Sequence, residues 1–306
     1  MTRDSTRRRL ARVGSVAGLL VGVAGVVFVV RTLAARSDEV ADAWSTLEAP
    51  RLVVSVALGV AAMWWIGRLW AGLLGSSDLP ARRTMAWYFT GQLGKYVPGG
   101  IWPVVGRSEM AVRGGVPRPA AYSATALSMT TTYLAAGFAG GIGSLLSWTY
   151  PLLGAAAVTG TVAAVLLAGT SAVRRIAARV LARFGTPPSS ATLARLALAH
   201  LPTWVLVSLA TQVTASAFGA DIGWAHMLCA ASLSWLAGFV VVGVPGGIGV
   251  REAAFCVLVS PSVPAGLAVS VALAARVVFI VVDVAAAVVA GAIAGRSAVR
   301  GGSAET

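Results

Sequence analysis

The sequence predicts an all-α integral membrane protein with six transmembrane helices and two re-entrant Pro-Gly-Gly hairpins, arranged as an inverted-topology repeat. Of its 306 residues, 57% are hydrophobic and 11% are charged, and the mean hydropathy is +0.81, which is typical of a membrane protein. Two similar motifs, GKYVPGGIW at 94–102 and VPGGIGVRE at 244–252, each place a helix break inside an apolar stretch. Breaks at corresponding places in two halves of a membrane protein indicate a transporter's binding site.

The basic residues lie between the apolar segments, so the net charge of +13 indicates membrane orientation rather than nucleic-acid binding. The two cysteines, Cys229 and Cys256, lie in apolar surroundings, which excludes a disulfide framework, and they lack zinc spacing. The two histidines, His200 and His226, are too few and too scattered to indicate a metal site. The sequence therefore predicts neither a metal nor another cofactor.

The first half begins with a basic cytoplasmic segment at 1–12, followed by a charge-free first transmembrane helix from 13 to 30. A twin-arginine export signal is the alternative for this region, but the rest of the chain is also apolar. Residues 31–51 carry four acids and form an external loop. The second span, 52–74, returns to the cytoplasmic side.

The first hairpin follows from the length of the segment 86–97. At about 12 residues and 1.5 Å per residue, it is too short to cross roughly 30 Å of hydrocarbon. It stops at Pro98-Gly99-Gly100, and a second limb leads to Arg107, Arg113 and further arginines. Because both ends are basic, the hairpin is expected to enter and leave on the cytoplasmic side.

The segment 119–173 contains no charge and is long enough for two spans, which the interfacial aromatics and Pro151 at 148–151 divide. A basic cytoplasmic loop at 174–195 precedes an outward span at 196–218. The second hairpin, 223–260, enters from outside. Its first limb is long enough to span alone, but a full span would place Arg296 and Arg300 outside, against the positive-inside rule. The last span is 265–294.

This topology makes 13–294 a single transmembrane domain, with repeats at about 13–147 and 152–294 and a cytoplasmic tail at 295–306. It places 17 of the 24 basic residues in the cytoplasm, 3 outside and 4 in the membrane. The expected location is a bacterial inner membrane, with several spans and both termini cytoplasmic.

Each Pro-Gly-Gly break has the chemistry of an anion site. A helix that resumes after a break presents free N–H groups and a positive dipole end, which bind phosphate or carboxylate. Two hairpins that enter from opposite sides bring two such ends to mid-membrane. The candidate substrate-binding residues are Lys95, Pro98, Gly99, Gly100, Trp102, Arg107, Glu109, Pro245, Gly246, Gly247, Arg251 and Glu252.

An unpaired cation at that depth costs at least about 2.5–3.5 kcal/mol, so it needs water, a carboxylate or an anionic ligand. The alternative to an anion site is a hairpin held by its own ion pairs, with Glu109 and Glu252 as local partners. Arg276 and Asp283 in the last span are expected to pair with other elements, and a relay through Asp283 is the alternative role. The other residues considered as cavity liners are Gln92, Gln212 and Thr130–Thr132.

The residues at 94–102 with Gly106-Arg107, together with PGGIGVREA at 245–253, resemble the lysylphosphatidylglycerol synthase transmembrane (flippase-like) family over about 13–294. The resemblance implies re-entrant hairpins and movement of lipids between leaflets. The best-known members translocate aminoacylated phosphatidylglycerol and carry an aminoacyl-transferase domain that this sequence lacks. Relatives accompany the assembly of polyprenyl-linked glycans. The sequence shows no catalytic constellation, so the synthase activity is not carried over.

The resulting expectation is a flippase or scramblase-like transporter, not an enzyme, for an anionic or phosphate-bearing phospholipid or polyprenyl-linked lipid. The expected partners are membrane lipids with anionic head groups and no nucleic acid, with a homo-oligomer or glycan-assembly enzymes as further partners to consider. A carrier for a small soluble anion and a membrane transferase or its non-catalytic partner are the alternatives.

Overall fold

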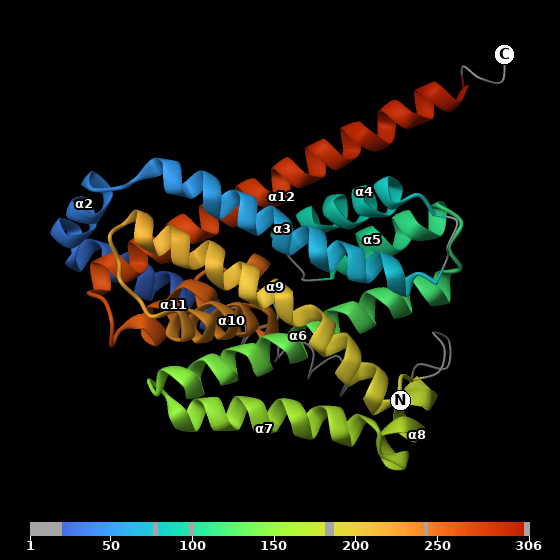
Figure 1. Ribbon diagram of the computed structural model, residues 1–306, viewed down its shortest axis with the longest axis horizontal. Helices are drawn as coiled ribbons and strands as arrows, with labels where there is room; N and C mark the ends of the chain where they lie inside the picture. Colours follow the sequence, from blue (N-terminus) through green and yellow to red (C-terminus); the bar gives the residue numbers. More distant parts are fainter. Residues whose placement is uncertain (1–19, 76–78, 98–100, 181–186, 242–243, 303–306) are drawn as a thin grey trace.

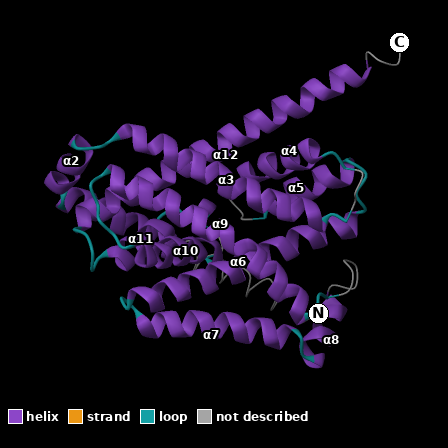
Figure 2. Ribbon diagram, viewed as in Figure 1, coloured by secondary structure: helices purple, strands orange, loops and turns teal. Residues whose placement is uncertain are grey.

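The computed structural model describes residues 20–75, 79–97, 101–180, 187–241 and 244–302. Within these ranges every regular element is a helix (Figures 1 and 2). The first helix, Leu20–Ala35, bends by 80° into α2 (Ser37–Ser45). The elements that follow are α3 (Ala49–Leu73), α4 (Ala81–Gln92), η1 (Leu93–Tyr96), α5 (Trp102–Arg113), α6 (Arg118–Ser147), α7 (Pro151–Ala168), α8 (Ser171–Val180), α9 (Ser190–Ala217), α10 (Trp224–Val240), η2 (Pro245–Gly247), α11 (Val250–Val259) and α12 (Ala265–Gly302).

The predicted all-α membrane class is confirmed, but the number of six spans is not. Four described helices are long and apolar enough to cross a bilayer, namely α3, α7, α9 and the Ala265–Ala294 part of α12. The bent pair of Leu20–Ala35 and α2 makes a fifth if it is counted as one span. The predicted first span begins at residue 13, and its start lies outside the described residues. The predicted third span forms α6, whose many glycine, serine and threonine residues lower its hydropathy.

The order of elements is the same in the two halves of the chain. Each half has a helix, a short helix, a long helix, a pair of helices with a break, and a further long helix. The helices in third place, α3 and α9, run antiparallel, because the Ser55 hydroxyl donates to the Ala210 carbonyl (2.7 Å) while the Trp65 ring N–H donates to the Ala199 carbonyl (2.8 Å). Antiparallel equivalents are what an inverted repeat requires, since its halves run in opposite senses.

Small residues let α6 pack closely between its neighbours (Figure 1). A side chain at Gly140 or Gly143 would collide with α10, and one at Gly141 would collide with Val158 of α7. Helices in membranes associate through such small residues, since the surrounding lipid is as apolar as leucine and supplies no hydrophobic driving force. The small and hydroxyl-bearing residues that make α6 less apolar than the four candidate spans therefore serve helix packing.

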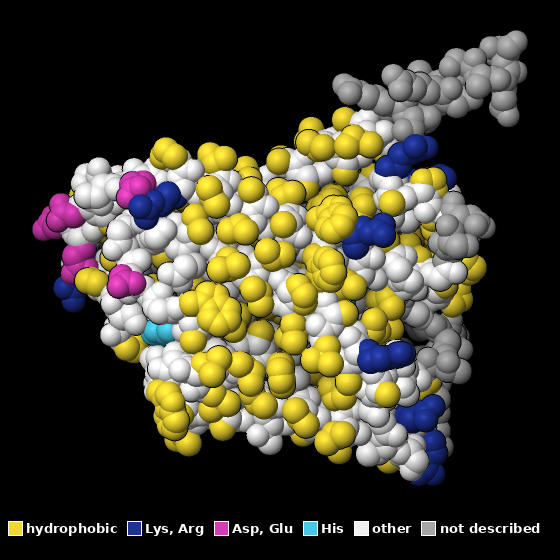
Figure 3. Space-filling model, viewed as in Figure 1, with side chains coloured by type: hydrophobic (Ala, Val, Ile, Leu, Met, Phe, Trp, Pro, Cys, Tyr) yellow, Lys and Arg dark blue, Asp and Glu magenta, His cyan; other side chains and the backbone are white. Residues whose placement is uncertain are grey.

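The surface separates charge from apolar side chains. Figure 3 shows a broad hydrophobic band, with most Lys and Arg side chains at one end and the Asp and Glu side chains at the α2 end. Several helices expose large hydrophobic side chains, for example those of Val53, Leu152, Leu166 and Val288. A soluble monomer rarely exposes so much apolar surface, so this band is the surface that faces lipid.

The first helix packs directly on the second break, and this contact yields a prediction. A Cβ at Gly25 would collide with the backbone of Gly249, whereas a Cβ at Gly72 in α3 would meet nothing within 4 Å. Gly25→Ala is therefore expected to destabilise the protein by about 1–3 kcal/mol through overpacking. Gly72→Ala is the matched control and should be neutral or stabilising, because alanine favours helix. Thermal unfolding in detergent compares them, and equal melting temperatures would contradict the contact.

Candidate functional site

The first predicted break separates α4 and η1 from α5. Glycines bring the two limbs together, since a Cβ at Gly91 would collide with Arg107 and one at Gly94 would collide with the backbone of Trp102 and Pro103. These contacts pair 91 with 107 and 94 with 102–103, so α4–η1 and α5 form an antiparallel helical hairpin. Each of α4 and α5 has 12 residues, which is too short for a span. Pro98, Gly99 and Gly100, predicted at the tip, lie outside the described residues.

The second break separates α10 from α11. Gly246 and Gly247 have φ angles of 55° and 68°, and Gly249 has 81°, so the chain turns through a left-handed region that favours glycine. A Cβ at Gly247 would collide with the backbone of Gly238, which places the turn against the end of α10. The 17 residues of α10 lie at the lower limit of the roughly 17–25 that a span needs. The helix α10, Trp224–Val240, is therefore shorter than the apolar segment 223–244 that was predicted as the first limb.

The two breaks meet. The Lys95 carbonyl and the Tyr96 ring lie within 4 Å of the position that a Cβ of Gly246 would take. Lys95 and Tyr96, which precede the first Pro-Gly-Gly motif, thus lie against the second motif, about half a chain away in sequence.

Helix α12 holds both breaks through ion pairs. Lys95 Nζ lies 2.6 Å from Asp283 Oδ2, and the Tyr96 hydroxyl donates to the same oxygen at 2.5 Å. About two helical turns before Asp283, Arg276 Nη1 lies 2.5 Å from Glu252 Oε1, and its Nη2 donates to the Gly246 carbonyl at 3.3 Å. The Asp283 side chain is 1% exposed. Arg276 and Asp283 thus pair with other elements and not with each other.

The carboxylates that follow the breaks, Glu109 and Glu252, do not pair with the neighbouring Arg107 and Arg251. Glu252 caps α11 by accepting from the Gly249 N–H at 2.7 Å, and its other oxygen binds Arg276. Glu109 binds Arg118 through two contacts of 2.7 and 2.9 Å and accepts from the Tyr122 hydroxyl at 2.5 Å. The alternative of hairpins held by Arg–Glu pairs of their own is therefore wrong, because tertiary packing supplies other partners.

The two arginines that follow the breaks, Arg107 and Arg251, consequently have no ion pair within 4.0 Å among the described residues. Arg107 is 4% exposed, its Nε has no hydrogen-bond partner among the described residues, and its guanidinium lies 5.3 Å from the Tyr88 ring centre. Arg251 lies over the Trp235 ring at 3.7 Å, with Phe279 at 5.5 Å. Aromatic faces stabilise a cation only in part, by about 2 kcal/mol when it is desolvated. Both arginines therefore retain capacity for an anion.

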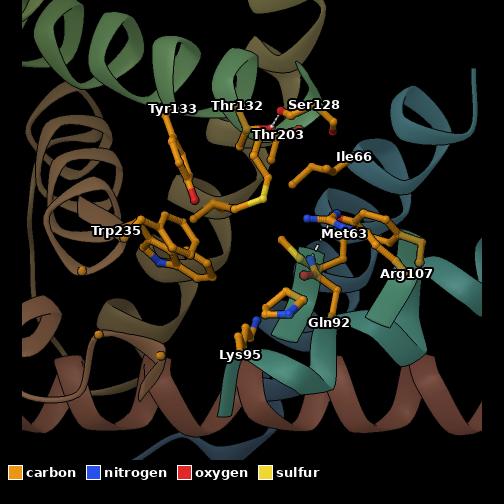
Figure 4. Close-up of a pocket in the computed structure, with 18 of the residues that line it drawn as sticks. Met63, Ile66, Gln92, Lys95, Arg107, Ser128, Thr132, Tyr133, Thr203 and Trp235 are labelled. Atoms are coloured by element: carbon orange, nitrogen blue, oxygen red, sulfur yellow. Dashed lines mark hydrogen bonds between the residues drawn. The ribbon is translucent and has the colours of Figure 1, made fainter. Parts of the chain in front are cut away.

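A cavity of about 300 Å³ lies beside the meeting point of the breaks. Figure 4 shows Arg107, Gln92 and Lys95 facing it from one side and Trp235 and Tyr133 from the other. The described residues that line it are Met63, Ile66, Tyr88, Gln92, Lys95, Ile101, Pro103, Arg107, Ser128, Met129, Thr132, Tyr133, Thr203, Trp204, Val207, Trp235, Gly238, Phe239, Val241, Val244, Gly246 and Gly247. Two of them, Lys95 and Arg107, are cations and none is Asp or Glu. Lys95 is paired with Asp283, so Arg107 supplies the uncompensated positive charge of the cavity.

Four further residues predicted for the site, Arg251, Trp102, Pro245 and Glu109, do not line the cavity. Arg251 lines a smaller adjoining hollow of about 20 Å³ together with Lys95, Gly246 and Arg276. Trp102 begins α5 with its side chain 45% exposed, and Pro245 begins η2. Glu109 does not line the cavity.

Of the polar residues predicted as liners, Gln92 and Thr132 line the cavity, whereas Gln212 donates to the Ile222 carbonyl. Sequence reasoning missed Ser128, Tyr133 and Thr203. The available signal was the i, i+4 spacing of Ser128 and Thr132, which places both on one helical face.

Comparison with known proteins gives one family match. The family model described as the lysylphosphatidylglycerol synthase TM region matches residues 15–287. A search of curated proteins finds no match. Within the described residues, no group of three His, Cys, Asp or Glu side chains is placed to hold a metal ion.

Proposed function

The chain belongs to the lysylphosphatidylglycerol synthase transmembrane region family, and on this basis we propose that it moves an anionic or phosphate-bearing lipid between the leaflets of the membrane. The family is membrane-associated and lipid-related, and its transmembrane region is not itself a catalytic domain. The proposed transporter is a flippase or scramblase, and the movement of the lipid is passive or driven by an ion gradient.

The observation that carries this proposal is the uncompensated positive charge at the cavity. Arg107 is buried, lacks a carboxylate partner among the described residues and lines a cavity without Asp or Glu among its described residues. A buried unpaired charge is strongly destabilising, so proteins retain it where a ligand supplies the opposite charge. A guanidinium forms paired hydrogen bonds with a phosphate, which makes it the preferred residue for such a group.

The arrangement of polar and apolar side chains suits a head group with attached tails. The cavity places Lys95, Arg107 and Gln92 on one side and aromatic side chains on the other, inside a molecule whose outer surface is apolar. We propose that the head group binds at Lys95 and Arg107 while the acyl or prenyl tails stay in the bilayer. The short limbs α4, α5 and α11 and the antiparallel α3 and α9 support re-entrant hairpins in an inverted repeat, with both termini on the basic, cytoplasmic side.

Reconstitution tests the proposal directly. Liposomes containing the protein are prepared with one of three fluorescent lipids. Phosphatidylglycerol and phosphatidylcholine have identical acyl chains and differ only in the head group, and the third lipid is a polyprenyl phosphate. We expect faster leaflet exchange of at least one anionic lipid than of phosphatidylcholine, measured by quenching of the outer leaflet. Uptake of radiolabelled phosphate and of glycerol phosphate is measured in parallel. Exchange no faster than in empty vesicles for every anionic lipid would refute the proposal, and uptake of a soluble anion would favour a carrier.

A further inference from the structure

A second cavity lies outside the proposed transport site, between α6, α7 and α9. Its volume is about 270 Å³, and its lining residues are Leu134, Ala135, Phe138, Thr161, Val162, Val165, Leu166, Ala194, Ala197, Leu198 and Leu201. Thr161 is the one hydroxyl residue among these described residues, and no polar atom of the lining is exposed to the cavity. The cavity is therefore fully apolar, unlike the cavity beside the two breaks.

Close glycine contacts lie on both sides of this cavity along α7. Near the outer end of α7, Gly154 lies against Gly141 of α6, and a side chain at either position would collide with the other helix. At the opposite end of α7, a side chain at Gly169 would collide with Ser190 at the start of α9. The residues of α7 that line the cavity, from Thr161 to Leu166, lie between these two contacts.

The cavity opens to the surface that faces lipid. The side chains of Val162, Leu166 and Leu198 line it and are 44%, 64% and 58% exposed. An apolar cavity of about 150 Å³ inside a protein stays free of water and takes up a small hydrocarbon such as benzene. A larger apolar cavity that opens into a bilayer is accordingly filled by a hydrocarbon chain.

Positive charge without nearby acids marks one end of the cavity. Arg195 is exposed and lies three residues before Leu198, which places both on one face of α9. Arg174 and Arg175 are exposed in α8, which directly follows α7. The sequence contains no Asp or Glu from residue 110 to residue 220. No Asp or Glu close in sequence is therefore available to neutralise Arg174, Arg175 and Arg195.

We propose that this cavity and the adjoining arginines form a binding site for one anionic diacyl phospholipid of the surrounding membrane, separate from the transport site. One acyl chain occupies the apolar cavity between α6, α7 and α9. The phosphate lies at the junction of α7, α8 and α9, within reach of Arg174, Arg175 and Arg195. Basic clusters at a membrane surface attract anionic lipids in this way.

Native mass spectrometry of the full chain, titrated with phosphatidylglycerol or phosphatidylcholine of identical acyl chains, tests the site. We expect one phosphatidylglycerol to bind to this site much more tightly than phosphatidylcholine. The double variant Arg174→Gln/Arg175→Gln should weaken that binding about 30-fold. Arg82→Gln/Arg83→Gln removes the same charge from the start of α4 and should leave the binding unchanged.

A second pair of variants tests the apolar part. Ala197→Phe fills the cavity and should abolish the binding, whereas Ala164→Phe adds the same ring to an exposed position of α7 that does not line the cavity. Melting temperature and monodispersity in detergent show whether each variant is folded. Arg107→Gln should remove only lipid bound at the transport site, so failure of one proposal leaves the other testable. Equal binding of both lipids, unchanged binding by Ala197→Phe, or a dimer that covers this face would overturn the inference.

Discussion

Replacing Arg107 by glutamine is expected to slow leaflet exchange of the anionic lipid about 10–150-fold while leaving the melting temperature unchanged or raised. A hydrogen bond to a charged group contributes about 1.5–3 kcal/mol, and each 1.4 kcal/mol corresponds to a factor of ten. Arg107 is buried without an ion pair among the described residues, so its charge destabilises the protein that holds no ligand. Glutamine keeps most of the side chain and removes that charge.

Slower leaflet exchange together with an unchanged or raised melting temperature distinguishes a functional role of Arg107 from a structural one. A purely structural Arg107 would lower the melting temperature when it is removed, and transport would fall only because less protein is folded. Arg107→Lys should retain part of the activity, since it keeps the charge but loses the two parallel donors. Arg68→Gln is the control, because Arg68 is exposed on α3 beside Trp64 and does not line the cavity. Loss of exchange in the Arg68 variant equal to that in the Arg107 variant would contradict the assignment.

Replacing Asp283 by asparagine is expected to destabilise the protein by about 3 kcal/mol. The change removes the carboxylate that lies 2.6 Å from Lys95, in a position where the Asp283 side chain is 1% exposed. Breaking a buried ion pair by removing one partner costs about 3–5 kcal/mol, because the other charge stays buried and unpaired. The lower end applies here, since Lys95 is 15% exposed and lines the cavity. Unfolding in mixed detergent micelles measures the change.

The companion variant Lys95→Met completes a double-mutant cycle. In the double variant Lys95→Met/Asp283→Asn no charge is left unpaired at this position, so most of the lost stability should return. Leaflet exchange should stay low in the double variant, because Lys95 is also proposed to bind the head group. Additive losses of stability, without recovery, would show that the contact between Lys95 and Asp283 contributes little.

The helical class and the two breaks were predictable because they depend on local signals. Pro98, Pro245 and the glycines that follow them interrupt a helix whatever surrounds them, and apolar runs identify membrane helices. The repetition of elements in the two halves follows from the same signals. The count of six spans was less secure, because α6 carries glycine and hydroxyl residues for packing and is less apolar than a lipid-facing span.

The partners of the charged residues were not predictable from sequence neighbours. Glu252 and Arg251 are adjacent, but successive residues on a helix point in different directions, so Glu252 reaches Arg276 of α12 while Arg251 lies on Trp235. Similarly, the turn between α5 and α6 brings Arg118 and Tyr122 to Glu109 and leaves Arg107 unpaired among the described residues. Which carboxylate meets which cation depends on helix packing that spacing alone does not specify.

The two ion pairs of α12 make the two halves of the protein thermodynamically interdependent. Asp283 holds the first break and Arg276 holds the second, on one continuous helix (Figure 1). A rotation or axial shift of this helix therefore alters both contacts together. An anion that replaces Asp283 as the partner of Lys95 also changes the free energy of the contact at the other break. In the proposed transporter, such reciprocity would let one binding event change the accessibility of both membrane faces.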